Sequence, residues 1–219
     1  MRKTNIYINR VLASLVLGGM VLSCTEPAAE KEAAYTHFFV TAEDVSNPAD
    51  ENAPFGRMWS QGEEVAVWNG KTLSIFTSSQ KNKGKTSLFF GETENTGNFL
   101  VCYPADDNAG AGEMTFEVPA KQQAVEGGIS DESYVLVGKS DNNYVKLANM
   151  LGYVSVSIER ENIVSMVLET GNKAALAGTV AVSSSDLACT VKNAENSVGL
   201  RGSGALTPGT YVFAVVPQT

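Results

Sequence analysis

Side chains that could carry out catalysis are sparse in this sequence. His37 is the only histidine among 219 residues, so neither a Ser-His-Asp triad nor a multi-histidine metal site can be built. Ser78 and Lys81 have the S-x-x-K spacing of the penicillin-recognising enzymes, but that motif needs a helix start and a K-T-G partner, and both are missing. The remaining candidates for catalytic groups are Asp and Glu side chains that the fold would bring close to each other. We therefore expect a protein that is not an enzyme.

Two further segments contain residues of the types that bind ions. Hard oxygen ligands for calcium gather in one segment, at Asp106, Asp107, Asn108 and Glu113. Their spacing is not that of the D-x-[DN]-x-[DN]-G loop, which favours an exposed acidic turn. Gly202, Gly204 and Gly209 lack the strand and helix that flank a phosphate-binding glycine loop. We expect no metal ion and no cofactor.

The two tryptophans, Trp59 and Trp68, allow two interpretations. A buried indole packs in a core, whereas an exposed indole can stack on a sugar ring. Core packing is the interpretation that we favour for both. The alternative is that the protein is a surface glycan-binding module that uses one of these rings.

The N-terminus has the pattern of a secretory signal peptide. Arg2, Lys3 and Arg10 precede an uncharged, mostly apolar stretch over residues 11–22. Crossing a bilayer needs about 20 apolar residues, so this stretch is too short to remain as a membrane anchor. We assign residues 1–23 to the signal peptide.

The residues that end this segment indicate lipidation. Val21-Leu22-Ser23-Cys24 resembles the bacterial lipobox, in which the cysteine is acylated and becomes the first residue of the mature protein. Several acyl chains hold a protein on a bilayer far better than one. We expect Cys24 to carry the lipid and to place the protein on the outer membrane, at the cell surface or in a fimbrium. Ordinary secretion, with a cut after Ser23, is the alternative.

Charge argues against nucleic acid as a partner. The chain has 16 Lys and Arg against 24 Asp and Glu, a net charge of −8. Removal of residues 1–23 takes away three positive charges and no negative ones, which gives −11. Nucleic-acid binding requires the opposite, a basic surface.

Cysteine usage leaves one question open. Once Cys24 is lipidated, only Cys102 and Cys189 remain, each in an apolar run. Export permits a disulfide between them, but two buried thiols are an equally good interpretation. The sequence does not decide between the two.

The rest of the chain predicts an all-β protein. Residues 24–34 are short and polar, as in a tether between the lipid and the folded part. Short apolar runs then recur at intervals of about ten residues, separated by turn-rich segments, and none keeps a 3.6-residue period long enough for a helix. We expect an antiparallel β-sandwich or barrel. The runs begin at His37, Glu64, Leu73, Thr86, Phe99, Met114, Tyr134, Gly152, Val164, Ala175, Leu187 and Thr210.

The order of these segments resembles the fimbrillin family, the surface lipoprotein pilins of anaerobic Gram-negative bacteria. The resemblance spans most of the mature chain. It consists of Cys24, the first strand THFFVTAE, an Arg before MWSQGEEVAVW, and the segments FLVCYPAD, FEVPAKQQ, YVLVGKS, VKLANMLGYVSVSIE, IVSMVLETGN, ALAGTVAV and YVFAVVPQT.

This resemblance implies two transthyretin-like β-sandwich domains and assembly by strand addition. In polymerising members, a protease cuts after an Arg and removes the first strand, which opens a groove for a strand of the next subunit. Arg57 occupies the matching position here, with an ordinary loop arginine as the alternative. The displaced strand would contain His37, Phe38, Phe39, Val40, Thr41 and Ala42.

The resemblance also implies a domain division and a set of partners. We expect one domain over residues 35–160 and the beginning of a second over 161–219, with further strands beyond Thr219. The implied partners are other fimbrial subunits or further copies of this chain, the outer membrane through the lipid, and ligands on host or bacterial surfaces. The predicted function is a lipid-anchored fimbrial subunit or a fimbrillin-like surface adhesion protein.

Overall fold

The computed structural model describes residues 34–47, 54–105 and 113–217. Within these ranges the regular elements are strands and one short 3-10 helix, η1 (Asp131–Ser133), so the all-β prediction is confirmed. No helix in these ranges is long and apolar enough to cross a membrane. The signal peptide, Cys24, most of the tether and residues 106–108 of the acidic turn lie outside the described residues.

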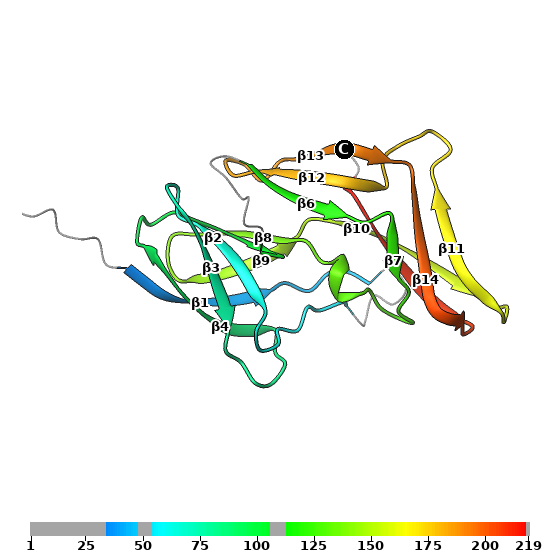
Figure 1. Ribbon diagram of the computed structural model, residues 1–219, viewed down its shortest axis with the longest axis horizontal. Coiled ribbons are helices and arrows are strands. Elements are labelled where there is room, and N and C mark those ends of the chain that lie inside the picture. The colour runs from blue at the N-terminus through cyan, green and yellow to red at the C-terminus, as the bar shows by residue number, and fades with distance from the viewer. Residues whose placement is uncertain (1–33, 48–53, 106–112, 218–219) are drawn as a thin grey trace, which may run out of the picture. The chain divides into compact units, whose positions relative to one another are not determined.

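Seven strands form a closed barrel (Figure 1). All neighbours pair antiparallel except the first and last in this order, which pair in parallel and close the ring. Their order around the barrel is β1 (Ala34–Ala42), β4 (Thr86–Glu94), β3 (Leu73–Ser78), β2 (Glu64–Trp68), β5 (Phe99–Tyr103), β8 (Leu136–Ser140) and β9 (Tyr144–Asn149).

Period-two alternation places one face of each barrel strand in the interior. On β1, Phe38 and Val40 are fully buried in the interior cluster, which also contains Trp59, Phe76, Phe89 and Phe99. β8 and β9 approach closely at Gly138. A Cβ atom at this position would lie 2.1 Å from the Lys146 carbonyl oxygen, which is too close for any side chain. Glycine is therefore required at this position.

A three-stranded sheet covers one outer face of the barrel. Its order is β13 (Cys189–Glu195), β12 (Ala177–Ser183) and β6 (Glu113–Val118). Met114, Phe116 and Val180 of this sheet share a buried cluster with Ala66 and Val137 of the barrel. The barrel and this sheet are therefore two layers around one core.

The remaining strands enclose a third cluster. β11 (Ile163–Glu169), β14 (Ser197–Leu206) and β7 (Lys121–Gln123) form one sheet, in which β7 runs parallel to β14 (Figure 1). β10 (Gly152–Ile158) pairs with β15 (Gly209–Val215). The cluster between them contains Leu176, Val198, Leu200, Leu206, Tyr211, Phe213 and Val215.

Strand pairing differs from the expectation in two respects. The first strands close into a barrel that includes one parallel pair, whereas we expected antiparallel sheets throughout. Strands on both sides of residue 160 also share sheets: β6 pairs with β12, β7 with β14, and β10 with β15. The pairing therefore does not follow the expected division into 35–160 and 161–219. Alternation specifies the buried face of a strand but not its partner, which explains both differences.

Cys102 and Cys189 both pack in the cluster between the barrel and the sheet of β6, β12 and β13. Cys102 is buried on β5, and Cys189 is a half-buried free thiol at the start of β13. Burial raises the pKa of the Cys189 thiol. The structure has no disulfide between Cys102 and Cys189.

Candidate functional site

The predicted displaced strand lies within β1 and is a full member of the barrel. Its backbone pairs antiparallel with β4 from Ala34 to Thr41 and parallel with β9 from Phe39 to Ala42. Phe38, Val40 and Ala42 are between 0% and 2% exposed. Removal of this strand would therefore expose apolar core and leave unpaired backbone groups on both neighbouring strands.

The other face of β1 points out of the barrel. Phe39 stacks on Tyr144 of β9, with ring centroids 4.7 Å apart and an interplanar angle of 7°. The His37 ring packs edge-on against Phe39, and its Nε2 accepts a hydrogen bond of 3.0 Å from the Asn143 side-chain amide. His37 thus has a structural role on this outer face.

Arg57, the predicted processing site, is buried in a cluster of polar and aromatic side chains. The residue is 2% exposed. Its guanidinium donates to the Glu63 carboxylate, to the Asp131 carboxylate at 2.5 Å, and to the Tyr103 hydroxyl at 2.6 Å. Two ion pairs and a hydroxyl therefore replace the water that the cation loses on folding.

Aromatic rings complete the surroundings of Arg57. The guanidinium carbon lies 4.8 Å from the centroid of the Tyr103 ring, 5.5 Å from that of Tyr134 and 5.9 Å from that of Trp59, within the range of cation–π attraction. Burial raises the pKa of the Tyr103 and Tyr134 hydroxyls, and the charge of Arg57 partly opposes this. Both hydroxyls therefore stay neutral at physiological pH. We call these residues, with Glu63 and Asp131, the Arg57 cluster.

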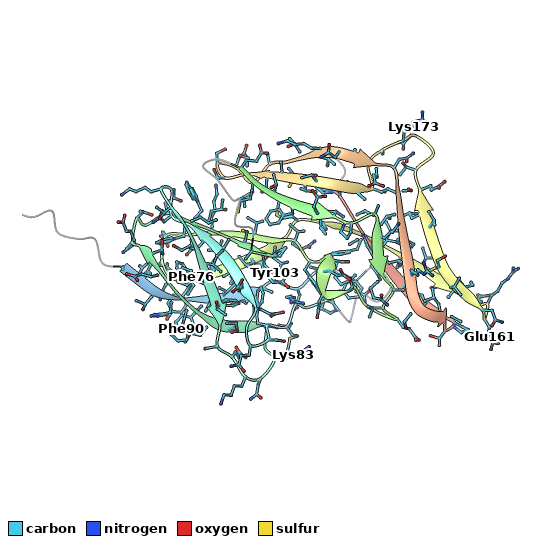
Figure 2. All side chains as sticks on the ribbon, in the orientation of Figure 1. Phe76, Lys83, Phe90, Tyr103, Glu161 and Lys173 are labelled. Atoms are coloured by element: carbon cyan, nitrogen blue, oxygen red, sulfur yellow. The ribbon has the colours of Figure 1, made fainter. Side chains whose placement is uncertain are left out.

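Local turn chemistry positions the cluster. Gly62 has φ +84°, in the left-handed region that glycine adopts without strain. The chain turns at this glycine, and the Glu63 side chain lies near the Ser60 backbone. The Glu63 carboxylate accepts a hydrogen bond of 2.6 Å from the Ser60 backbone N–H and so lies beside Arg57. Asp131 comes from η1, and Tyr103, labelled in Figure 2, ends β5.

This geometry bears on proteolysis. A protease that cuts after arginine must take up the arginine side chain, and the Arg57 side chain is only 3% exposed. Cutting at Arg57 therefore requires local opening of the cluster. Arg160, in contrast, is exposed in the connection between β10 and β11, so it is open to the same protease.

The residues around Arg57 were not identified from the sequence as a site. Glu63 lies in the segment MWSQGEEVAVW, which directly follows Arg57 in the sequence. Asp131 lies 74 residues further along the chain, and no local pattern connects the two. Only the folded barrel brings η1 to the loop that contains Arg57.

The two tryptophans differ in burial, and core packing is confirmed for Trp59. Trp59 is fully buried and packs edge-on against Phe89 and Tyr103, each with centroids 5.2 Å away. Trp68 is half-buried and packs against the cluster between the barrel and the sheet of β6, β12 and β13. Among the described residues, no three His, Cys, Asp or Glu side chains form a group that could hold a metal ion.

Comparisons with known proteins are sparse. No family model matches the chain, and no curated protein matches it. Among solved structures, the chain is similar to the crystal structure of a putative cell adhesion protein from Bacteroides thetaiotaomicron VPI-5482, with 15% sequence identity and a TM-score of 0.37. The match covers 84% of this chain and 75% of the other. At this TM-score the similarity carries no functional argument, and membership of the fimbrillin family stays a prediction.

Proposed function

We propose that this protein is a non-enzymatic, lipid-anchored surface protein, a fimbrial subunit or a fimbrillin-like adhesion protein, which assembles by addition of a β-strand from a neighbouring subunit. The observation that carries the proposal is the position of β1. This strand is hydrogen-bonded to β4 on one side and to β9 on the other, and the side chains on one of its faces pack in the barrel core. The sequence at the N-terminus supports lipidation at Cys24. In this proposal the fold is a variant of the transthyretin-like sandwich.

Loss of β1 would create a groove suited to another strand. The Phe38 ring packs edge-on against Phe76 and Phe99, with centroid distances of 5.1 Å to each. Without β1, these rings and the edges of β4 and β9 meet water. A strand with alternating apolar residues restores both the ladder and the packing, which is the general mode of β-strand addition.

The Arg57 cluster gives this mechanism a control point. β1 leads through residues 43–56 to Arg57, so a cut at Arg57 would separate β1 from the rest of the barrel. Because the cluster buries the arginine side chain, opening of the cluster precedes the cut. In this proposal the protein remains intact until a protease encounters the opened loop.

A reversible lock on β1 tests the proposal. Thr41 and Thr86 are cross-strand partners whose hydroxyl oxygens lie 2.8 Å apart, so cysteines at both positions can join β1 to β4 by a disulfide. The variant carries Cys189→Ala, to remove the free thiol, and Arg160→Lys, to protect the exposed loop. After treatment with an arginine-specific protease, we expect multimers by light scattering only when the disulfide is reduced.

The matched control joins two other strands. Ser157 and Thr210 are partners on β10 and β15, with hydroxyl oxygens 2.9 Å apart, and a disulfide there should leave assembly unchanged. The proposal is wrong if the cut protein without any added cysteine stays monomeric. It is equally wrong if the protein with β1 locked assembles under oxidising conditions.

A further inference from the structure

A groove on the outer face of the barrel has the composition of a ligand site. It encloses about 490 Å³ and is lined by Phe39, Thr41, Thr86, Lys139, Tyr144 and Lys146. These residues come from β1, β4, β8 and β9 and point away from the barrel interior. We call this feature the β1–β9 groove.

One aromatic residue of the groove, Tyr144, is exposed, and the other, Phe39, is half-buried. Tyr144 is 64% exposed although it carries a large ring, and one of its faces is stacked on Phe39. This stacking holds the Tyr144 ring in a defined orientation. A rigid aromatic surface of this kind, apolar on its face and polar at its hydroxyl, suits a ligand with both C–H and O–H groups. Pyranose rings have this character.

The charge of the groove is opposite to that of the chain. The chain has a net charge of −8, yet the residues that line the groove include two lysines and no acidic residue. Neither Lys139 nor Lys146 forms an ion pair with a carboxylate of the described residues. Lys139 donates one hydrogen bond, of 2.5 Å, to the Ser185 carbonyl oxygen, which leaves two of its donors for a ligand.

Two lysines that line one groove, with no carboxylate counterion among the described residues, favour an anion. Like charges that face one space repel each other, and a bound anionic group relieves this repulsion. The Thr41 and Thr86 hydroxyls, 2.8 Å from each other, have further hydrogen-bonding capacity at the same groove. The groove therefore combines an aromatic face, two cations and two hydroxyls.

We propose that the β1–β9 groove binds an acidic saccharide, with a sugar ring stacked on Tyr144 and its carboxylate or sulfate group held by Lys139 and Lys146. This site includes neither Trp59 nor Trp68. Because Phe39 and Thr41 lie on β1, the saccharide site exists only while β1 is in place. Binding is therefore a property of the uncut chain.

The test uses the uncut full chain and a hyaluronan hexasaccharide, which carries glucuronate, in isothermal titration calorimetry. Chitohexaose, a neutral sugar of the same length, is the comparison ligand. We expect saturable binding of the acidic sugar that weakens with added salt. Tyr144→Ala and Lys146→Ala should each weaken it about tenfold.

Two control variants lie outside the lining residues. Phe90→Ala removes another exposed aromatic ring, and Lys83→Ala removes another exposed lysine; Figure 2 labels both residues. Both variants should bind like the unmodified chain, and melting temperatures verify that all four variants fold.

Three results would overturn the inference. The first is no saturable binding of the acidic sugar at millimolar concentration, and the second is equal binding of chitohexaose. The third is Tyr144-dependent self-association in sedimentation experiments, which would make the groove a contact between copies. Since no protease is used, none of these results depends on assembly by strand addition.

Discussion

At the scale of single residues, Arg57 combines two ion pairs, a hydrogen bond to a hydroxyl and contacts with three aromatic rings. A buried guanidinium is costly unless it is paired, and here Glu63, Asp131 and Tyr103 pair it. The two carboxylates differ in environment, since the Glu63 side chain is 19% exposed and that of Asp131 is 78% exposed. The ion pair between Arg57 and Glu63 therefore contributes more to the free energy of unfolding than the ion pair between Arg57 and Asp131.

We predict that Arg57→Met lowers the free energy of unfolding by about 3 kcal/mol, because it leaves Glu63 partly buried without a cation. Asp131→Asn should cost about 1 kcal/mol or less, because an exposed pair is screened by water. Urea denaturation followed by tryptophan fluorescence measures both values. Equal losses in the two variants would contradict this description of the cluster.

At the scale of elements, the side chain of Gln122 forms the backbone hydrogen bonds with β15 that a neighbouring strand would otherwise form. Gln122, on β7, is 4% exposed. Its side-chain Nε2 donates to the Ala214 carbonyl oxygen at 2.7 Å, and its Oε1 accepts from the Ala214 N–H at 3.0 Å. A single amide thus satisfies both backbone groups of a buried residue, as a neighbouring strand would.

We predict that Gln122→Leu destabilises the protein by about 2–3 kcal/mol, because the buried N–H and C=O of Ala214 lose these partners. Gln123→Leu is the matched control, since Gln123 is exposed on the same strand, and it should change stability by about 0.5 kcal/mol or less. Thermal denaturation and amide exchange at Ala214 report the effect. An unchanged exchange rate of the Ala214 amide in the Gln122 variant would show that the Gln122 side chain does not protect the backbone of Ala214.

At the scale of the whole molecule, the barrel and the sheet of β6, β12 and β13 share a core. Ala66, Leu100 and Val137 from the barrel pack with Phe116 and Val180 from the sheet. Strands that precede and follow residue 160 contribute to this core together. Unfolding of one part therefore exposes the apolar surface of the other.

We predict that the folded part unfolds in one cooperative transition, not in two transitions separated at residue 160. Trp59 reports on the barrel interior, and far-UV circular dichroism reports on all strands. In a Trp68→Phe variant, the two signals should change at the same urea concentration. A strand signal that changes before the Trp59 signal would indicate an independent second unit.

The local elements were largely predictable, because their causes are local. Short apolar runs between turn-rich segments predicted strands that begin near His37, Glu64 and Leu73, and the structure has β1, β2 and β3 there. The burial of Phe38 and Val40 on one face of β1 follows from the alternation of side chains along a strand. The candidate site was predicted less well: the sequence pointed to Arg57 but not to its burial.

The sequence by itself determined that this chain is built from strands, which faces of them are apolar, and that the folded part is acidic, since these properties depend on residue type and short-range order. Only the tertiary structure decided that β1 pairs with β9, that Asp131 meets Arg57, and that Lys139 and Lys146 share a groove with Tyr144. The physical reason is the distance along the chain. Contacts between residues far apart depend on which strands pair, and that choice is made by the packing of the whole core, which no single segment encodes.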